Sequence, residues 1–452
     1  MREWLRIKHA TRIFIKGVQR CIHVHTVTKP SSSTPIAIIM RLLWVLVGTV
    51  GCAAAVVKRS GLSFDYNKDK IRGVNLGGWL LLEPWITPSL FQQFTGQSDP
   101  AVDERSFCEK LGAAEAQAQL TAHWSSFITA QDFADLASIG INHVRIPIGY
   151  WAFISLPSDP FVPGAGDYLT RAIGWAQQYG IKVWVDLHGA PGSQNGFDNS
   201  GWRGQLQWQK GSNVGYTLQA MQVIASRYAT PAYAATVTAI ELVNEPLGPQ
   251  LDMGGVKGYY WNGYNTVRGR GDTGVCIHDA FQTVSYWDNF MSTSSGAYNS
   301  FLDTHQYQVF TDGQLWQDLS SHIGTSCSIG QALASATFWT AVGEFSGAMT
   351  DCAQWLNGFN TGSRWEAQFE GASYHGSCSE HGSISTWSDS LRQDTTKYIE
   401  AQFDAFEQGV GWFFWTWKTE GGDDAWSFQN LQASGIIPFP LTTRRYYNQC
   451  GY

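Results

Sequence analysis

The chain has 452 residues, of which 44% are hydrophobic, so it is long enough to bury a sizeable core. Ten of its 30 Lys and Arg but only one of its 37 Asp and Glu precede Ser60, so the remainder carries a formal charge of −16. A surface this acidic repels nucleic acid and anionic lipid. A neutral ligand such as a carbohydrate remains compatible with it. The 21 Trp fit this class, because flat rings stack on sugar faces, although most must fill the core.

Residues 1–59 read as a leader. A single charge at Arg41, an apolar run from Leu42 and the alanines at 53–55 predict a signal peptide over residues 40–55. Lys58 and Arg59 then resemble a dibasic propeptide site, and residues 1–39 are interpreted as an upstream extension. The apolar stretch 36–57 is also long enough to be a signal anchor. We expect cleavage, secretion and a single catalytic domain over residues 60–452.

The cysteines agree with secretion. Two of the eight fall in the leader, and an even set of six remains, which predicts disulfides in an exported chain. Six cysteines allow fifteen pairings, and the sequence alone does not choose among them. The six are Cys108, Cys276, Cys327, Cys352, Cys378 and Cys450.

Eight apolar, strand-like runs follow one another along the body, at residues 71–83, 142–149, 181–189, 237–246, 274–281, 300–310, 340–347 and 411–418. Segments with apolar residues three and four positions apart precede the second, third, fourth and eighth runs, which predicts helices there. Strands that alternate with helices indicate a parallel sheet. Eight of them in about 390 residues predict an α/β fold, a (β/α)8 TIM barrel whose long βα loops form a pocket.

In such a barrel the chemistry lies at the C-terminal ends of the strands. The fourth run ends in Asn244, Glu245 and Pro246, which taken alone could be a polar strand end closed by a proline, with extended backbone before it. However, polar or aromatic residues recur at nearly every strand end, which favours function. They are Glu83, Arg145, Asp186, His188, Asn244, Glu245, His305, Tyr307, Glu344 and Trp415.

Glu245 and Glu344 end the fourth and seventh runs, which lie on opposite sides of an eight-stranded barrel. Two facing carboxyl groups suit glycoside hydrolysis, in which one protonates the leaving oxygen and the other attacks the anomeric carbon. A separation of about 5 Å predicts retention of configuration, and about 6.5–9.5 Å predicts inversion.

The neighbouring residues suggest supporting roles. Asn244 is expected to turn its amide into the pocket and hold a sugar 2-hydroxyl. Arg145 and Tyr307 are expected to hydrogen-bond Glu344 and keep it ionised. His188 and His305 are expected to donate hydrogen bonds near the sugar hydroxyls or the acid. Glu83 is expected to accept hydrogen bonds from the terminal sugar, and Trp415 to form the floor beneath the reacting ring. Each histidine could instead be structural, and the two together make a thin metal ligand set, so no metal or other cofactor is expected.

Long, ordered motifs in the body carry a family resemblance. "RGVNLGGWLLLEPWITPSLF", "HVRIPIGYW", "DLHGAPGSQNGFDNSG", "NEP", "DTHQYQVF", "GEFS" and "FFWTWKTE" resemble the fungal exo-1,3-β-glucanases of glycoside hydrolase family 5, from about residue 70 to Tyr452. The resemblance implies that Glu245 is the acid/base and Glu344 the nucleophile. It implies supporting roles for Arg145, His188, Asn244, His305, Tyr307 and Trp415, a terminal-glucose contact for Glu83, and a clamp at the pocket entrance formed by Phe197 and Phe310.

The resemblance also implies the disulfides Cys327–Cys450 and Cys352–Cys378, and it leaves Cys108–Cys276 as a third predicted pair. The expected protein is a secreted, retaining glucan 1,3-β-glucosidase that releases glucose from non-reducing ends, with the pKa of Glu245 raised to about 6 for proton donation. An endo-β-1,6-glucanase or another β-glucosidase of this fold, and a non-catalytic glucan-binding wall protein, are the alternatives. The expected partner is β-glucan, the expected state is a monomer, and neither nucleic acid nor a stable membrane partner is expected.

Overall fold

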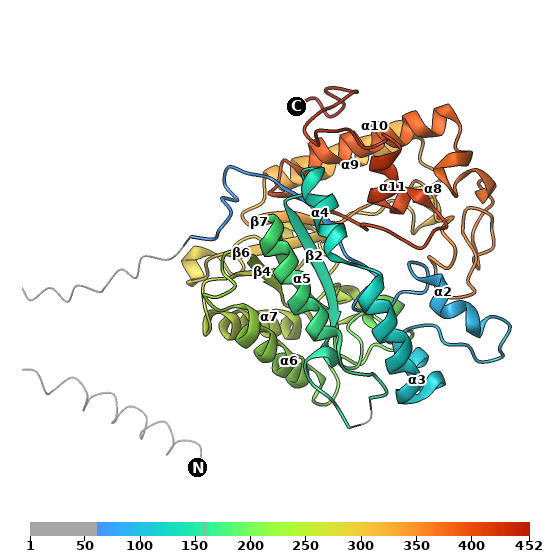
Figure 1. The fold of residues 1–452 in the computed structure, drawn as a ribbon. Helices are drawn as coiled ribbons and strands as arrows, with labels where there is room; N and C mark the ends of the chain where they lie inside the picture. The colour runs from blue at the N-terminus through green and yellow to red at the C-terminus, as the bar shows by residue number, and fades with distance from the viewer. Residues whose placement is uncertain (1–60, 158) are drawn as a thin grey trace, which may run out of the picture. The chain divides into compact units, whose positions relative to one another are not determined.

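Eight parallel strands close a barrel in chain order, as predicted (Figure 1). The computed structural model describes residues 61–157 and 159–452, so the predicted leader, signal peptide or anchor, and dibasic site lie outside the described residues. The first strand pairs with the last, and Ile71 lies opposite Gly411. The strands are β1 (Ile71–Asn75), β2 (His143–Gly149), β3 (Lys182–Gly189), β4 (Val237–Glu241), β5 (Gly274–His278), β6 (Ser300–His305), β7 (Trp339–Glu344) and β8 (Gly411–Phe414).

Helices connect the strands, and β2 lies between α4 and α5 in Figure 1. The connection from β5 to β6, residues 279–299, is fully described and contains 3₁₀ turns but no α-helix. None of the helices within residues 61–452 is long and apolar enough to cross a bilayer. The α-helices are α2 (Pro88–Phe91), α3 (Glu104–Ser126), α4 (Ala130–Ser138), α5 (Ala165–Tyr179), α6 (Asn213–Tyr228), α7 (Met253–Arg268), α8 (Asp312–Leu315), α9 (Leu319–Ala334), α10 (Asp389–Phe406) and α11 (Phe428–Ala433).

The helix α5 shows how the sequence specifies these elements. Leu169, Ala172, Ile173 and Ala176 recur at three- and four-residue spacing and are buried. The helix ends at Gly180, whose left-handed backbone (φ 74°) suits a glycine C-cap. This apolar spacing and the glycine at the end of the segment are the sequence features that predict a helix here.

The barrel interior is layered. Its N-terminal end is filled by an apolar cluster that includes Trp184, Phe301 and Phe413. Toward the C-terminal end the inward-facing residues become polar, because Asn75 pairs with Arg145 across β1 and β2, and Asp186 pairs with Glu241 across β3 and β4. A buried charged layer therefore separates the apolar core from the open end of the barrel.

The cysteines correct one prediction. Cys327–Cys450 and Cys352–Cys378 form disulfides, whereas Cys108 and Cys276 are free and buried, so the predicted third pair is wrong. Cys276 lies on β5 inside the barrel, where its thiol is near Glu241. Cys108 lies on α3 and packs in the other, outer hydrophobic cluster. The barrel wall separates the two thiols.

Candidate active site

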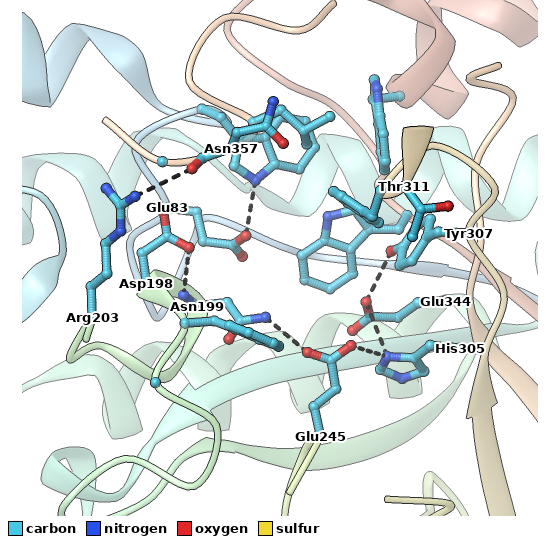
Figure 2. A pocket seen from close by; sticks show the side chains of 18 of the residues that line it. Glu83, Asp198, Asn199, Arg203, Glu245, His305, Tyr307, Thr311, Glu344 and Asn357 are labelled. Atoms are coloured by element: carbon cyan, nitrogen blue, oxygen red, sulfur yellow. Dashed lines mark hydrogen bonds and ion pairs between the residues drawn. The ribbon is translucent and has the colours of Figure 1, made fainter. Parts of the chain in front are cut away.

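A cavity of about 590 Å³ opens at the C-terminal ends of the strands, within the usual size range of ligand sites. The loops after β3 and β7 form much of its wall. Figure 2 shows Glu245, His305 and Glu344 pointing toward one another at its base, with Glu83 farther along. Of the predicted site residues, those that line the cavity are Glu83, Phe197, Glu245, His305, Tyr307, Phe310, Glu344 and Trp415.

His305 fixes the spacing of the two glutamates. Its Nδ1 lies 2.7 Å from Glu245 Oε1 and 3.3 Å from Glu344 Oε2, so these two oxygens cannot be farther apart than the sum of the two distances. That sum is shorter than the roughly 6.5–9.5 Å that inverting enzymes need for a water between their carboxyl groups. The register of the sheet contributes to the spacing, since His305 and Glu344 are paired across β6 and β7. The geometry of the pair therefore suits retention of configuration.

Glu245 is held in an unusual backbone conformation. Its φ is 46°, in the left-handed region, and not the extended geometry expected before Pro246. Such a conformation is costly for a non-glycine residue and is concentrated at functional sites. Asn199 donates a hydrogen bond from Nδ2 to Glu245 Oε2 at 3.0 Å, so both carboxyl oxygens have a partner. Asn199 lies in the motif after β3, but the sequence analysis did not identify it.

Glu344 has the two partners that were predicted. Arg145 Nη1 donates to Glu344 Oε1 at 2.9 Å, and the Tyr307 hydroxyl donates to Oε2 at 2.9 Å. The carboxyl group is thus fixed at both oxygens and directed into the cavity.

Arg145 is shared among more carboxylates than the sequence suggested. Its guanidinium, fully buried, lies 2.8 Å from Glu241, 3.2 Å from Asp186 and 3.5 Å from Asp303 in addition to Glu344. Glu241 and Asp303 were not predicted, because they precede the candidate residues Asn244, Glu245 and His305 in the same apolar runs. They form the charged layer beneath the cavity and fix the orientation of Arg145.

Asn244 does not have the environment that was predicted. It is fully buried and not among the cavity-lining residues, and its Oδ1 accepts a hydrogen bond from Arg145 Nη2 at 2.8 Å. Its Nδ2 lies 3.3 Å from His188 Nε2, and His188 Nδ1 is 2.6 Å from Asp186. The amide oxygen and one amide hydrogen are therefore engaged within the protein, and Asn244 and His188 lie behind the residues that line the cavity.

The ionisation of the pair also differs from the expectation. Burial raises the pKa of Glu344 to about 8, although the charges of His305 and Arg145 oppose this. Burial also raises the pKa of Glu245, but the hydrogen bond and charge of His305 outweigh it and hold this pKa below its ordinary value. Burial lowers the pKa of His305, but the charges of Glu344 and Asp303 outweigh this and raise it well above the ordinary value. The predicted rise for Glu245 is thus wrong in this structure.

The far end of the cavity is closed by residues that the sequence analysis missed. Arg203, in the loop after β3, donates from Nη2 to the carbonyl oxygen of Asn357, in the loop after β7, at 3.3 Å (Figure 2). Gly358 (φ 107°) allows this, since a Cβ there would lie 2.3 Å from the guanidinium carbon. Glu83 lies on the same side of the cavity, where Trp85 Nε1 donates to its Oε2 at 3.0 Å. The two loops thus form a wall behind Glu83.

Aromatic rings surround the rest of the cavity. Trp415 is buried and stacks on His188, with 5.6 Å between ring centroids. At the rim, Phe197 and Phe310 are 41% and 38% exposed, which is unusual for large apolar side chains. Phe281, from the loop after β5, is 42% exposed and meets Phe197 edge to face. It was not predicted, because a lone loop phenylalanine gives no signal in the sequence.

Within residues 61–157 and 159–452, two groups of side chains have the chemistry of metal ligands. One comprises Glu245, His278 and His305, whose candidate atoms lie within 4.8 Å of one another. However, the backbone N–H of Ala280 donates to His278 Nδ1 at 3.0 Å, which leaves the ring proton on Nε2. A ligating histidine normally donates its second N–H instead, so His278 is poorly suited to hold a metal. The other group, Glu241, Cys276 and Asp303, surrounds the position already filled by Arg145.

Comparison with known proteins places this site in a family. The sequence pattern described as cellulase (glycosyl hydrolase family 5) matches residues 108–421. This chain belongs to glycosyl hydrolase family 5. A relative named glucan 1,3-beta-glucosidase from Blumeria graminis is 48% identical over 88% of this chain and 93% of its own length.

Other relatives agree. Glucan 1,3-beta-glucosidase of Candida oleophila is 47% identical over 91% of this chain and 98% of its own length. Glucan 1,3-beta-glucosidase I/II of Saccharomyces cerevisiae is 46% identical over 86% of this chain and 90% of its own. Among solved structures, a rutinosidase from Aspergillus niger matches with a TM-score of 0.66 over 82% of this chain and 99% of its own, at 22% identity, which supports the fold alone.

Proposed function

We propose that this family 5 protein is a retaining glucan 1,3-β-glucosidase that releases glucose from the non-reducing ends of β-1,3-glucan. The observation that carries the chemistry is the spacing of Glu245 and Glu344, whose facing oxygens lie 2.7 Å and 3.3 Å from the same nitrogen of His305. The linkage is suggested by relatives named glucan 1,3-beta-glucosidase at 46%, 47% and 48% identity.

In the first half of the reaction, a Glu344 oxygen forms a bond to the anomeric carbon while the bond to the leaving oxygen breaks. Glu245 gives its proton to that leaving oxygen. Where Glu344 holds the proton, as its raised pKa favours, that proton reaches Glu245 before this step. Nδ1 of His305 faces both oxygens, so it can pass its proton to Glu245 and take the one from Glu344, and its own charge is unchanged.

In the second half, Glu245 is ionised and accepts a proton from water as the water oxygen attacks the anomeric carbon. The ester bond to Glu344 then breaks and glucose leaves with the configuration of the substrate. The hydrogen bonds from His305 and Asn199, which favour the ionised form of Glu245, support this base role.

The exo mode of action is supported by the wall of the cavity. Arg203 and Asn357 line the side on which Glu83 lies and are joined by a hydrogen bond, which would hinder a glucan chain from extending past that point. Glu83 Oε1 has no hydrogen-bond partner among the described residues, which leaves it available to a hydroxyl of a terminal sugar. Phe197 and Phe310 stand at the open side, where the next glucose would lie.

The test uses the protein from Ser60 onward with reduced laminarin at pH 5, and NMR identifies the first product. We expect β-glucose alone, and none from Glu344→Gln, while Glu115→Gln on the surface of α3 acts like the unchanged protein. Early α-glucose would mean inversion. A ladder of oligosaccharides would mean endo action, and glucan binding without turnover would favour a wall-binding role.

We further propose that the protein is secreted and acts as a monomer. The two disulfides support export, since such bonds persist in oxidising compartments. N-terminal sequencing of protein collected from culture medium tests the export: a start near Ser60 is expected, and retention in the membrane fraction would favour the signal anchor.

A further inference from the structure

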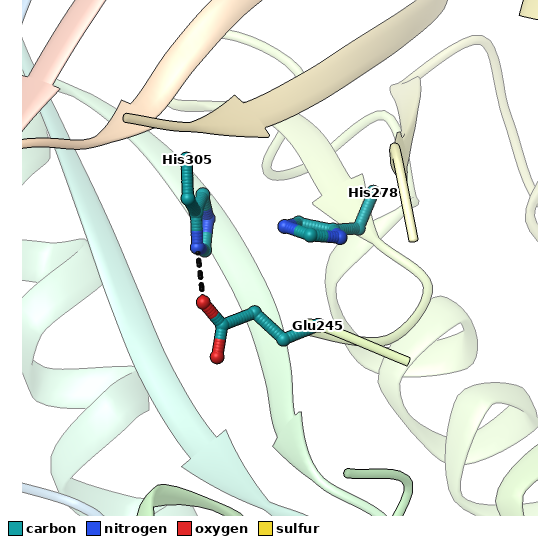
Figure 3. Close-up of side chains that lie close together, drawn as sticks. All are labelled: Glu245, His278 and His305. Atoms are coloured by element: carbon teal, nitrogen blue, oxygen red, sulfur yellow. Dashed lines mark hydrogen bonds and ion pairs between the residues drawn. The ribbon is translucent and has the colours of Figure 1, made fainter. Parts of the chain in front are cut away.

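His278, at the end of β5, has no part in the mechanism given above, yet it lies against the catalytic pair (Figure 3). Its ring meets that of His305 nearly at a right angle, 78°, with 4.4 Å between centroids. It is fully buried and does not line the cavity, so it does not reach substrate. Any effect of His278 on the reaction must therefore be transmitted through a neighbouring residue.

The hydrogen bonds of His278 fix its proton. Its Nδ1 accepts from the backbone N–H of Ala280, so Nε2 carries the hydrogen and is a donor. The backbone supports this arrangement at some cost, because Ala280 (φ 53°) and Phe281 (φ 58°) both adopt left-handed conformations. The Tyr260 hydroxyl also donates to the His278 carbonyl oxygen at 2.8 Å. The ring is therefore held firmly.

The donor atom has no conventional acceptor. Within the described residues, His278 Nε2 finds no hydrogen-bond partner although it is completely buried. In Figure 3 the ring nitrogen farther from the backbone points toward His305. The ring of His305 carries a positive charge, so its face does not attract an N–H group. The edge of the His278 ring therefore packs on the face of His305, and the contact holds the ring by its shape.

His305 needs such support. One end of its ring is bound to Glu245 through Nδ1, but its Nε2 is 3.4 Å from Asp303 and has no hydrogen bond there. A flip of the ring about its Cβ–Cγ bond would put a carbon atom in the place of Nδ1 and break the contacts with Glu245 and Glu344. The orientation that the proposed proton exchange requires is thus secured at only one end by hydrogen bonding.

The charged groups around the two histidines come from several strands. Four carboxyl groups act electrostatically on His305. One further acidic side chain lies close to His278, and an arginine and another histidine also act on it. These are Asp186 on β3, Glu245 after β4, Asp303 on β6 and Glu344 on β7 for His305, and Asp279, Arg145 and His188 for His278. His278 is uncharged, as is His188, because burial, first, and the charges of His305 and Arg145 lower the pKa of His278 well below the ordinary value.

We propose that His278 is a positioning residue of the reaction, whose ring packs against the His305 imidazole and holds it so that Nδ1 faces both Glu245 and Glu344. This inference rests on the proposed function only for the identity of the reaction. The orientation of His305 is a property of the protein itself and can be observed without substrate.

The principal variant is His278→Asn, because the amide oxygen of asparagine takes the place of Nδ1 and still accepts from Ala280. The local turn is kept, and the ring contacts with His305 and with Phe281 are lost. We expect kcat/KM on laminarin to fall by about tenfold or more, within the factor of roughly 10²–10⁴ that general acid catalysis supplies. On 2,4-dinitrophenyl β-glucoside, whose leaving group needs no proton, the fall in kcat/KM should be smaller, because only the ionisation of Glu344 then depends on His305.

The matched variant is His278→Gln, whose longer side chain reaches the position of Nε2 and restores the packing against His305. It should recover much of the loss on laminarin. Equal losses on both substrates in His278→Asn, or equal activity of the Asn and Gln variants on laminarin, would overturn the proposal, since a structural role does not distinguish leaving groups.

NMR of the histidine ring protons provides a test independent of turnover. The Nδ1–H of His305, hydrogen-bonded at 2.7 Å, should give a downfield resonance that is present in the unchanged protein and in His278→Gln and lost in His278→Asn. If the protein cleaves neither substrate, the proposed function fails, but this resonance still decides the role of His278. Its persistence in His278→Asn would overturn the inference.

Discussion

Individual side chains of this site serve several partners at once. One guanidinium, that of Arg145, lies within 3.5 Å of four carboxyl groups, and one nitrogen of His305 faces both reacting glutamates. Like charges that share a buried site cannot all ionise, so each group depends on its neighbours. The charge state of Glu344 is therefore a property of the cluster and should respond to changes elsewhere in it.

Replacing Glu245 by Gln should reveal this dependence. The negative charge of Glu245 raises the pKa of Glu344, after the larger effect of burial, so its removal should lower that pKa. With 2,4-dinitrophenyl β-glucoside, for which no acid is needed, the acidic limb of kcat/KM should move to lower pH. A pH-rate profile of both proteins measures this. An unmoved limb, or one at higher pH, would contradict the coupling.

At the scale of elements, the strands supply the reacting groups and the loops give the cavity its shape. The strands and the residues at their ends were predictable, because apolar runs of strand length recur eight times and nearly all carry a polar or aromatic residue at the same end.

The helix α7 was not predicted, since its segment contains four glycines among its sixteen positions. Asp252 caps it by accepting from two backbone N–H groups, and Tyr259, Tyr260 and Tyr264 are buried against the barrel. Tertiary packing here outweighs low helix propensity.

The parts of the site that escaped prediction are those set by contacts distant in sequence. Arg203 and Asn357 are separated by 154 positions, and nothing in either loop indicates the other. The amide of Asn244 was expected in the cavity because the residue adjoins Glu245, but Arg145 binds it from a different strand. The predicted disulfide between Cys108 and Cys276 was wrong for the same reason, because the number of cysteines gives no information about the distance between two of them in the fold.

Arg203→Ala should open the closed end of the cavity. The variant loses the contact that joins the loops after β3 and β7 behind Glu83. We expect oligosaccharides to appear beside glucose among the early products from reduced laminarin, while cleavage of an aryl β-glucoside changes little. Product chromatography measures the ratio. Arg171→Ala, on the outer surface of α5, is the matched control, and glucose as sole product from Arg203→Ala would show that the wall does not set the mode of action.

For the whole molecule, the buried charged layer makes stability depend on pH. Burial raises the pKa of Asp186 to about 7 and those of Glu241 and Glu344 to about 8. Between their ordinary values near 4 and these raised values, the folded protein binds more protons than the unfolded chain, so its stability falls as pH rises. Buried neutral His188 and His278, whose pKa values burial lowers, act in the opposite sense and cost stability below about pH 6.5.

The unfolding temperature should therefore be highest near pH 5–6 and decline toward pH 8. Calorimetry at fixed ionic strength measures the profile. Glu241→Gln, which removes one of the titrating groups, should flatten the decline on the alkaline side. An unfolding temperature that rises from pH 5 to pH 8 would show that the layer is not protonated in the way described.

The pairing of β8 with β1 has a consequence for how the protein is made. Ile71 pairs with Gly411, so the first strand to leave the ribosome has to wait until nearly all of the barrel has been synthesised. Until then the growing chain has two open sheet edges, which are sites of aggregation, and its interior charges have no enclosing layer. Cys450 is joined to Cys327, so that crosslink is available only after synthesis has passed the barrel. Translation time, and not the speed of local folding, would then set how long the chain depends on chaperones.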